Sequence, residues 1–95
     1  MITTKQRASL RSMANGMETI LQIGKGGIAP ATVTQVNEAL LAREMIKLRV
    51  LENSPVTARE AATELAEQCQ AEIVQVIGTR FVLYKKHPKT PKIKI

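Results

Sequence analysis

The chain has 95 residues, of which 44% are hydrophobic and 23% are charged, a composition typical of one globular domain rather than of a disordered segment. Its net charge of +6 and its pI of about 9.9 favour a polyanionic partner, either a nucleic acid or an acidic membrane surface. Phe81 and Tyr84 are its only aromatic residues. This argues against a protein that stacks bases on an aromatic platform and favours one that recognises backbone and shape.

The residue inventory also argues against catalysis. There is no aspartate, one histidine and three serines, so a Ser-His-Asp triad cannot be assembled. The single Cys69 excludes an internal disulfide, fits a reducing cytoplasm and has no metal-ligand spacing around it. No run approaches the roughly 20 apolar residues of a membrane helix, and the N-terminal residues lack a secretory core. We therefore expect a soluble cytoplasmic protein without catalytic residues, metal, cofactor, membrane partner or small-molecule substrate.

The first predicted element is a helix that starts near Lys5, is capped by Thr3 or Thr4 and ends at Gly16. Its apolar stripe has helical spacing and should face the core; three basic side chains lie off it. Two explanations of these charges stay open: a solvated helix face, or a basic surface shared with the glycine-rich segment, which is near in sequence. The stripe consists of Leu10, Met13, Ala14 and Met17, and the basic residues are Lys5, Arg7 and Arg11.

A glycine-rich loop follows a short predicted strand at 20–23 and precedes a helix that begins at Pro30. Glycine lets a backbone approach a bulky partner because it has no Cβ atom. The N-terminus of the following helix presents free N–H groups and a positive dipole end, which favour an anion. The loop therefore has the features of a phosphate-binding segment, formed by Gly24, Lys25, Gly26 and Gly27.

Spacing separates several kinds of phosphate loop. The Gly-Lys-Ser/Thr ending of a P-loop is absent. Residues 24–29 do fit the dinucleotide pattern G-x-G-x-x-G/A, with Glu44 near the position of the ribose-binding acid, but 95 residues cannot supply both halves of that fold. Residues 24–27 also fit G-x-x-G, with which KH-type modules clamp a nucleic-acid backbone. A strand-to-helix turn without a ligand remains the plain alternative.

Two further elements follow the loop. The pattern predicts a helix over residues 30–42, whose apolar residues are Val33, Val36, Leu40 and Leu41. Residues 45–51 alternate as in a strand with one buried face. In this strand Ile46, Leu48 and Val50 should point into the core, and Lys47 and Arg49 out of it, toward solvent or a ligand.

Thr57 and Glu60 form a capping box that starts a third helix. Its buried face should be Ala61, Ala62, Leu65, Ala66 and Cys69, while Glu60, Glu64 and Glu67 form an acidic side that faces away from nucleic acid. Residues 73–77 and 81–84 read as strands of a hairpin joined by Gly78-Thr79.

Residues 85–95 hold five basic and no acidic side chains, and they lack the apolar pattern needed to fold alone. We expect a flexible basic tail in which His87 is exposed to solvent and binds no metal. Residues 1–27 are also basic, whereas the middle of the chain carries a small negative charge. This segregation indicates an electrostatic footprint for a polyanion.

The order helix, strand, G-x-x-G loop, helix, strand, helix, strand, strand resembles the CRM domain (chloroplast RNA splicing and ribosome maturation), and in particular the bacterial YhbY family of small RNA-binding proteins. The resemblance covers about residues 3–84. It is carried by Thr4-Lys5-Gln6-Arg7, Leu21-Gln22-Ile23-Gly24-Lys25-Gly26-Gly27, Glu44-Met45-Ile46-Lys47 and Val74-Gln75-Val76-Ile77-Gly78.

This resemblance implies an α/β fold: a single compact two-layer sandwich with the order α-β-α-β-α-β-β and a four-stranded mixed sheet, similar to the C-terminal domain of translation initiation factor three. It implies a CRM-like RNA-binding domain over residues 1–84, with the tail at 85–95 outside the shared pattern. It also implies an assembly factor that binds ribosomal RNA in large-subunit precursors. The RNA-binding residues that the resemblance implies are Gly24, Lys25, Gly26 and Gly27. Charge and expected facing add Lys5, Arg7, Arg11, Lys47 and Arg49.

Two other hypotheses stay open at this point. One is a general nucleic-acid-binding protein that is not tied to the ribosome and also binds DNA. The other is a nucleotide-binding enzyme subunit, which the dinucleotide pattern at residues 24–29 would support. The sequence does not identify the RNA segment or the oligomeric state.

Overall fold

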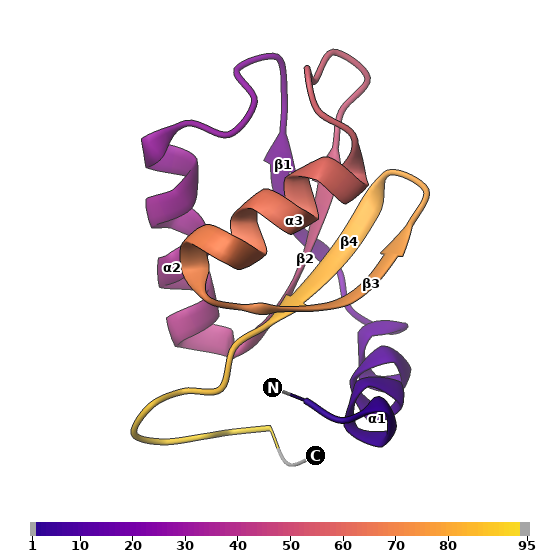
Figure 1. Ribbon diagram of the computed structural model, residues 1–95, viewed down its shortest axis with the longest axis vertical. Coiled ribbons are helices and arrows are strands. Elements are labelled where there is room, and N and C mark those ends of the chain that lie inside the picture. The colour runs from indigo at the N-terminus through magenta and orange to yellow at the C-terminus, as the bar shows by residue number, and fades with distance from the viewer. Residues whose placement is uncertain (1, 94–95) are drawn as a thin grey trace.

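A computed structural model describes residues 2–93 of the chain, and within them three helices are interspersed with four strands (Figure 1). The predicted order α-β-α-β-α-β-β is confirmed. The boundaries differ from the predicted ones by one or two residues. The elements are α1 (Thr4–Ala14), β1 (Thr19–Ile23), α2 (Pro30–Arg43), β2 (Met45–Val50), α3 (Ala58–Cys69), β3 (Glu72–Ile77) and β4 (Arg80–Tyr84).

Side-chain caps fix the starts of α1 and α3. The hydroxyl of Thr3 accepts the backbone N–H of Gln6, and the Gln6 side chain accepts that of Thr3. Thr57 and Glu60 make the same reciprocal pair at α3, as the sequence predicts. Each pair satisfies two N–H groups that the first helical turn leaves without partners.

The four strands form one mixed sheet in the order β1-β2-β4-β3. β1 and β2 are parallel, joined through α2, and β4 runs antiparallel to both β2 and β3. β1 and β3 are therefore the two edge strands. The C-terminal ends of β1 and β2 and the β3-β4 hairpin share one end of the sheet, because Val50 donates its N–H to the Thr79 carbonyl across 2.7 Å.

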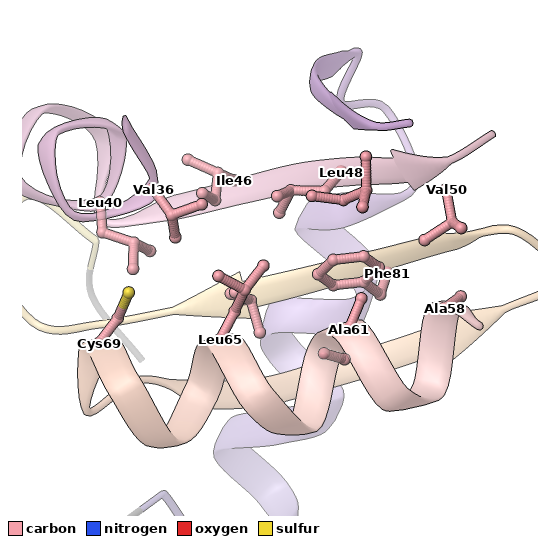
Figure 2. Packing of buried hydrophobic residues seen from close by; sticks show 13 residues of the cluster. Val36, Leu40, Ile46, Leu48, Val50, Ala58, Ala61, Leu65, Cys69 and Phe81 are labelled. Atoms are coloured by element: carbon pink, nitrogen blue, oxygen red, sulfur yellow. The ribbon is translucent and has the colours of Figure 1, made fainter. Parts of the chain in front are cut away.

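The main core lies between one face of the sheet and helices α2 and α3. Figure 2 shows Leu65 and Cys69 of α3 directed toward the sheet, where Ile46, Leu48 and Phe81 are fully buried. The alternation predicted for β2 is confirmed, because its core side chains come from every second residue. Two residues predicted to be in the core are exposed instead: Leu41 of α2 is 56% exposed, and Met13 of α1 is 40% exposed.

Helix α1 packs against the other face of the sheet, near β3 (Figure 1). Leu10 and Ala14 are buried there in a second cluster with side chains of β2, β3 and β4. This helix adds a partial layer to the expected sandwich of α2 and α3 on the sheet. It leaves the β1 and β2 side of that face without a covering helix among residues 2–93. The sheet residues of the cluster are Met45, Val74, Val82 and Tyr84.

Residues 85–93 follow a defined path around Glu44, whereas the sequence predicts a flexible tail over 85–95. The Glu44 carboxylate is fully buried and accepts the backbone N–H groups of His87 and Ile93, at 3.1 and 2.9 Å, and that of Lys92. Ile93 also packs against the second cluster. The difference arises because one buried acid, not an apolar pattern, orders this segment. Residues 94 and 95 lie outside the described part of the chain.

His87 is half-buried rather than exposed, which corrects the sequence-based expectation. Its Nδ1 atom accepts the N–H groups of Lys89 and Thr90, at 3.1 and 2.9 Å, and so closes a turn. No group of histidine, cysteine or acidic side chains that could hold a metal ion occurs within residues 2–93. Within the same residues, no helix is both long and apolar enough to cross a bilayer.

Candidate nucleic-acid interface

The glycine loop connects the end of β1 to the start of α2. Gly27 donates its N–H to the Gly24 carbonyl across 3.0 Å, so Lys25 and Gly26 occupy the two central positions of a tight turn. Both central residues are exposed. The loop therefore presents one ammonium group and one residue without a side chain at its tip.

The three glycines of the loop differ in whether the fold requires glycine at that position. Gly27 has a φ of +63°, and a Cβ atom there would come within 3.0 Å of Pro55 Cγ, so the fold itself requires glycine. At Gly24 a Cβ atom would make only ordinary contacts, the nearest at 3.7 Å from Leu51. At Gly26 it would meet nothing within 4 Å, and φ is not positive. Folding gives no reason for glycine at position 26, whereas close approach by a partner does.

The N-terminus of α2 differs from those of α1 and α3. Its N-cap residue is Ala29, whose side chain has no acceptor, and Pro30 at the first helical position has no N–H. The first helical hydrogen bond is made by Val33, whose N–H donates to the Ala29 carbonyl. The Thr32 hydroxyl accepts the N–H of Ala29 across 3.2 Å, but within the described chain the N-cap side chain accepts no N–H of the first turn, which follows the glycine loop. Such a terminus favours an anion.

Basic side chains continue from the loop onto the sheet face opposite α2 and α3. Arg49 lies beside Gln22 of β1, two residues before Gly24, and Lys47 lies on the same face one pleat away. Arg80 of β4 is the direct partner of Arg49 across the antiparallel pair and is exposed. Arg80 is not among the residues predicted from the sequence, where its place at the start of the second hairpin strand is the only signal for it. We call Lys47, Arg49 and Arg80 the basic sheet face.

Arg7 and Arg11 lie apart from the glycine loop, so the basic surface that α1 and the loop could share is not formed. They lie on α1, which contacts β3, whereas the glycine loop follows β1 at the other edge of the sheet. The nearness of α1 and the loop in sequence is lost because β4 and β2 lie between β3 and β1 in the sheet. Lys5 is an exposed residue of the first turn of α1.

Glu44 is not available to bind a ribose, because its buried carboxylate already accepts three backbone N–H groups of residues 87–93. Burial alone would raise the pKa of Glu44, but these three donors together with nearby His87 outweigh it and hold the pKa below its usual value. Glu44 also has a φ of +64° at the end of α2. Its role in this structure is to hold the C-terminal segment.

Cys69 is a core residue, as expected. Its side chain is 1% exposed in the main cluster, and burial raises the pKa of the thiol above its usual value. A protonated, buried thiol is a poor nucleophile.

The fold and the site define the class of this protein: a small basic α/β domain with an exposed glycine loop before a helix N-terminus. The sequence profile of the CRS1 / YhbY (CRM) domain matches residues 2–85, and the chain belongs to this family. The expected family resemblance is thereby confirmed.

Similar proteins agree with this assignment. A Bacillus subtilis (strain 168) protein named Probable RNA-binding protein YqeI is 39% identical over 95 residues, which cover 100% of this chain and 99% of the relative. Probable RNA-binding protein MJ0652 of Methanocaldococcus jannaschii is 30% identical over 86 residues, covering 88% of this chain and 63% of the relative. The solution structure of SAV1595 from Staphylococcus aureus, a hypothetical protein for which RNA binding was suggested, superimposes with a TM-score of 0.83 at 40% identity, covering 100% of this chain and 99% of that one.

Proposed function

We propose that this protein binds RNA through the glycine loop, and that its RNA is ribosomal RNA in precursors of the large ribosomal subunit, where it acts as an assembly factor and not as an enzyme. The observation that carries the proposal is Gly26, an exposed glycine that neither φ nor packing requires. It lies at the tip of the loop that precedes the N-terminus of α2, where the N-cap residue Ala29 offers no side-chain acceptor to the first turn. The names of the relatives, which describe RNA-binding proteins, support the same function.

The loop has three means of binding a phosphate group. The missing side chain at Gly26 lets the sugar-phosphate backbone approach the main chain closely. The first turn of α2 follows the loop closely in the chain, and its free N–H groups and helix dipole favour negative charge. Lys25 adds a mobile ammonium group with three donors. Together they hold a phosphate without reading a base.

The basic sheet face extends this contact along the nucleic acid. Arg49 and Arg80 are paired residues of neighbouring strands, and each carries a planar guanidinium group suited to a bidentate contact with a phosphate. Phe81 and Tyr84 are both buried, so neither can stack on a base. The contacts are therefore with phosphates fixed by the fold of the RNA, and selectivity comes from its shape.

A large folded RNA suits such a protein because it fixes several phosphates in one arrangement. The family resemblance implies ribosomal RNA of the large subunit as this partner. We place the binding in the cytoplasm. The competing possibility is a general nucleic-acid-binding protein, since phosphate contacts alone do not distinguish RNA from DNA.

A competition experiment at fixed salt separates the two possibilities. Labelled large-subunit ribosomal RNA, transcribed in vitro, is bound to the protein and challenged with unlabelled ribosomal RNA, single-stranded DNA or duplex DNA of equal nucleotide content. The proposal predicts that ribosomal RNA competes at least tenfold better than either DNA. Equal competition by DNA would favour the general binder and overturn the ribosomal assignment.

A further inference from the structure

A polar groove of about 450 Å³ lies at the β3 edge of the sheet, between α1 and α3. Three arginines line it, Arg7 and Arg11 from α1 and Arg59 from α3, together with the one acidic residue Glu72. The Glu72 carboxylate accepts the N–H of Ile2 across 3.0 Å. The lining thus carries an excess of positive charge, at the edge of the sheet opposite the β1 edge from which the glycine loop extends.

One of these arginines has an unsatisfied donor. The Nε atom of Arg7 is buried and has no hydrogen-bond partner within the described residues. A buried N–H without a partner carries a desolvation cost, which a small shift of the Arg7 side chain toward an acceptor in the groove would remove. The oxygen atoms of a phosphate group are strong acceptors with the right charge.

Arg59 reaches the groove from a different helix. Arg59 and Ala66 both line it and are seven residues apart, so they share one face of α3 across two turns. Glu60, Glu64 and Glu67 are not among the lining residues. The acidic side of α3 therefore lies outside the groove.

An open β3 edge would suit a peptide strand, but Arg11 occupies part of it. Val74 is the extra residue of an irregularity in the β3-β4 pairing, where Ile73 pairs with Leu83 and Gln75 with Val82. The Val74 carbonyl accepts the Nε–H of Arg11 across 3.1 Å. Since that carbonyl is already occupied, strand addition at this point is disfavoured.

From this geometry we infer that the groove is a second phosphate-binding site, which takes a stretch of RNA backbone at the sheet edge opposite the glycine loop. The inference rests on the proposed RNA binding and adds that the RNA is held at two edges of the sheet at once. A volume of about 450 Å³ admits a sugar-phosphate segment rather than a single ion. Arg7 and Arg59 bind the phosphate, and Arg11 is the positioning residue that closes the β3 edge.

The test uses Arg59→Gln, because the Arg59 side chain is exposed and its removal should not unfold the protein. Binding of in vitro transcribed large-subunit ribosomal RNA is measured by filter retention at several salt concentrations. Loss of one phosphate contact should reduce the salt slope by about 0.7–0.9 and the affinity about fivefold at 0.1 M salt. The matched control is Arg43→Gln in the last turn of α2, which does not line the groove and should bind like wild type.

Lys25→Ala separates this inference from the proposed function. The loop and groove sites are at opposite edges of the sheet. The factors by which Lys25→Ala and Arg59→Gln each reduce the affinity for ribosomal RNA should therefore multiply in the double variant. If the wild-type protein retains no ribosomal RNA, the proposed function itself fails. If wild type binds and Lys25→Ala weakens binding while Arg59→Gln matches Arg43→Gln, only the groove site is overturned.

A spectroscopic readout tests Arg7 without mutating it. In protein labelled with ¹⁵N at arginine, the Arg7 Nε–H resonance should shift on addition of a ten-nucleotide RNA, because this N–H gains an acceptor. An unchanged Arg7 resonance under saturating RNA would overturn the site. Binding of poly-glutamate that Arg59→Gln abolishes, with an unchanged RNA salt slope, would instead assign the groove to an acidic peptide and also overturn it.

Discussion

Arg49 and Arg80 lie directly opposite each other on the antiparallel strands β2 and β4, with their side chains on the same face of the sheet. Like charges in such a pair destabilise a sheet. Within residues 2–93, no hydrogen bond links either guanidinium to an acidic side chain. An arrangement that costs stability in the free protein becomes favourable when a polyanion lies across it, which relates the sheet face to the proposed function.

Arg80→Gln should therefore have two effects of opposite sign. The free energy of unfolding without RNA should rise by about 0.2–1 kcal/mol, because the repulsion is removed. The affinity for ribosomal RNA should fall about fivefold at 0.1 M salt, because a phosphate contact is lost. Urea unfolding and filter binding measure the two quantities, with Arg43→Gln as control. An unchanged RNA affinity would remove Arg80 from the interface.

Gly26→Leu tests the close approach at the loop tip. The structure leaves space for a side chain here, so the thermal midpoint should stay within about 2 °C of wild type. RNA binding should weaken at least tenfold, because the side chain holds the nucleic-acid backbone away from the main chain. Gly16→Leu is a matched control, since a Cβ atom there also meets nothing within 4 Å. Equal RNA affinity of both variants would show that the loop is only a turn.

Gly27→Ala should act on stability instead. Its φ of +63° and the 3.0 Å approach to Pro55 Cγ both disfavour a side chain, and we expect a loss of about 1–2 kcal/mol in the free energy of unfolding. Urea unfolding without RNA measures this loss. A variant as stable as wild type would contradict the assignment of Gly27 to folding.

Glu44→Gln should reduce the free energy of unfolding by about 1–3 kcal/mol at pH 7, because three backbone donors lose their charged acceptor. Urea unfolding of the full chain measures the loss. The control is a chain that ends at Lys85 and so lacks those donors. In that background the substitution should cost little, and an equal cost in both would show that Glu44 does not act through residues 87–93.

The same carboxylate gives a pH dependence with a defined sign. The pKa of Glu44 is lower in the folded protein than its ordinary value of 4.5, so its contribution is fully present above pH 4.5. The contribution is lost as pH falls through the lowered folded pKa. The stability difference between wild type and Glu44→Gln should thus be constant from pH 5 to 7 and shrink below pH 4.5. A difference that grows on acidification would contradict this sign.

The local parts of this structure could be predicted from sequence because local chemistry determines them. The capping-box pattern of Thr57 and Glu60 predicts the start of α3, and the alternation from Ile46 to Val50 predicts the buried face of β2. The glycine loop could be located because glycines, a lysine and Pro30 stand together in the sequence.

The parts that sequence reasoning missed depend on which segments meet in space. Nothing local specifies the order β1-β2-β4-β3, which separates Arg7 and Arg11 from the loop and places Arg80 beside Arg49. The burial of Glu44 likewise depends on backbone N–H groups more than 40 residues away, which no side-chain pattern reveals.

Ultraviolet crosslinking in growing cells, followed by sequencing of the attached RNA, tests the proposed ribosomal partner most directly. The wild-type chain and Gly26→Leu are compared at equal expression. We predict reads concentrated in large-subunit ribosomal RNA for wild type, and at least tenfold fewer for the variant. Reads spread over messenger RNA, or equal recovery of large-subunit ribosomal RNA by both proteins, would contradict binding of that RNA through the glycine loop.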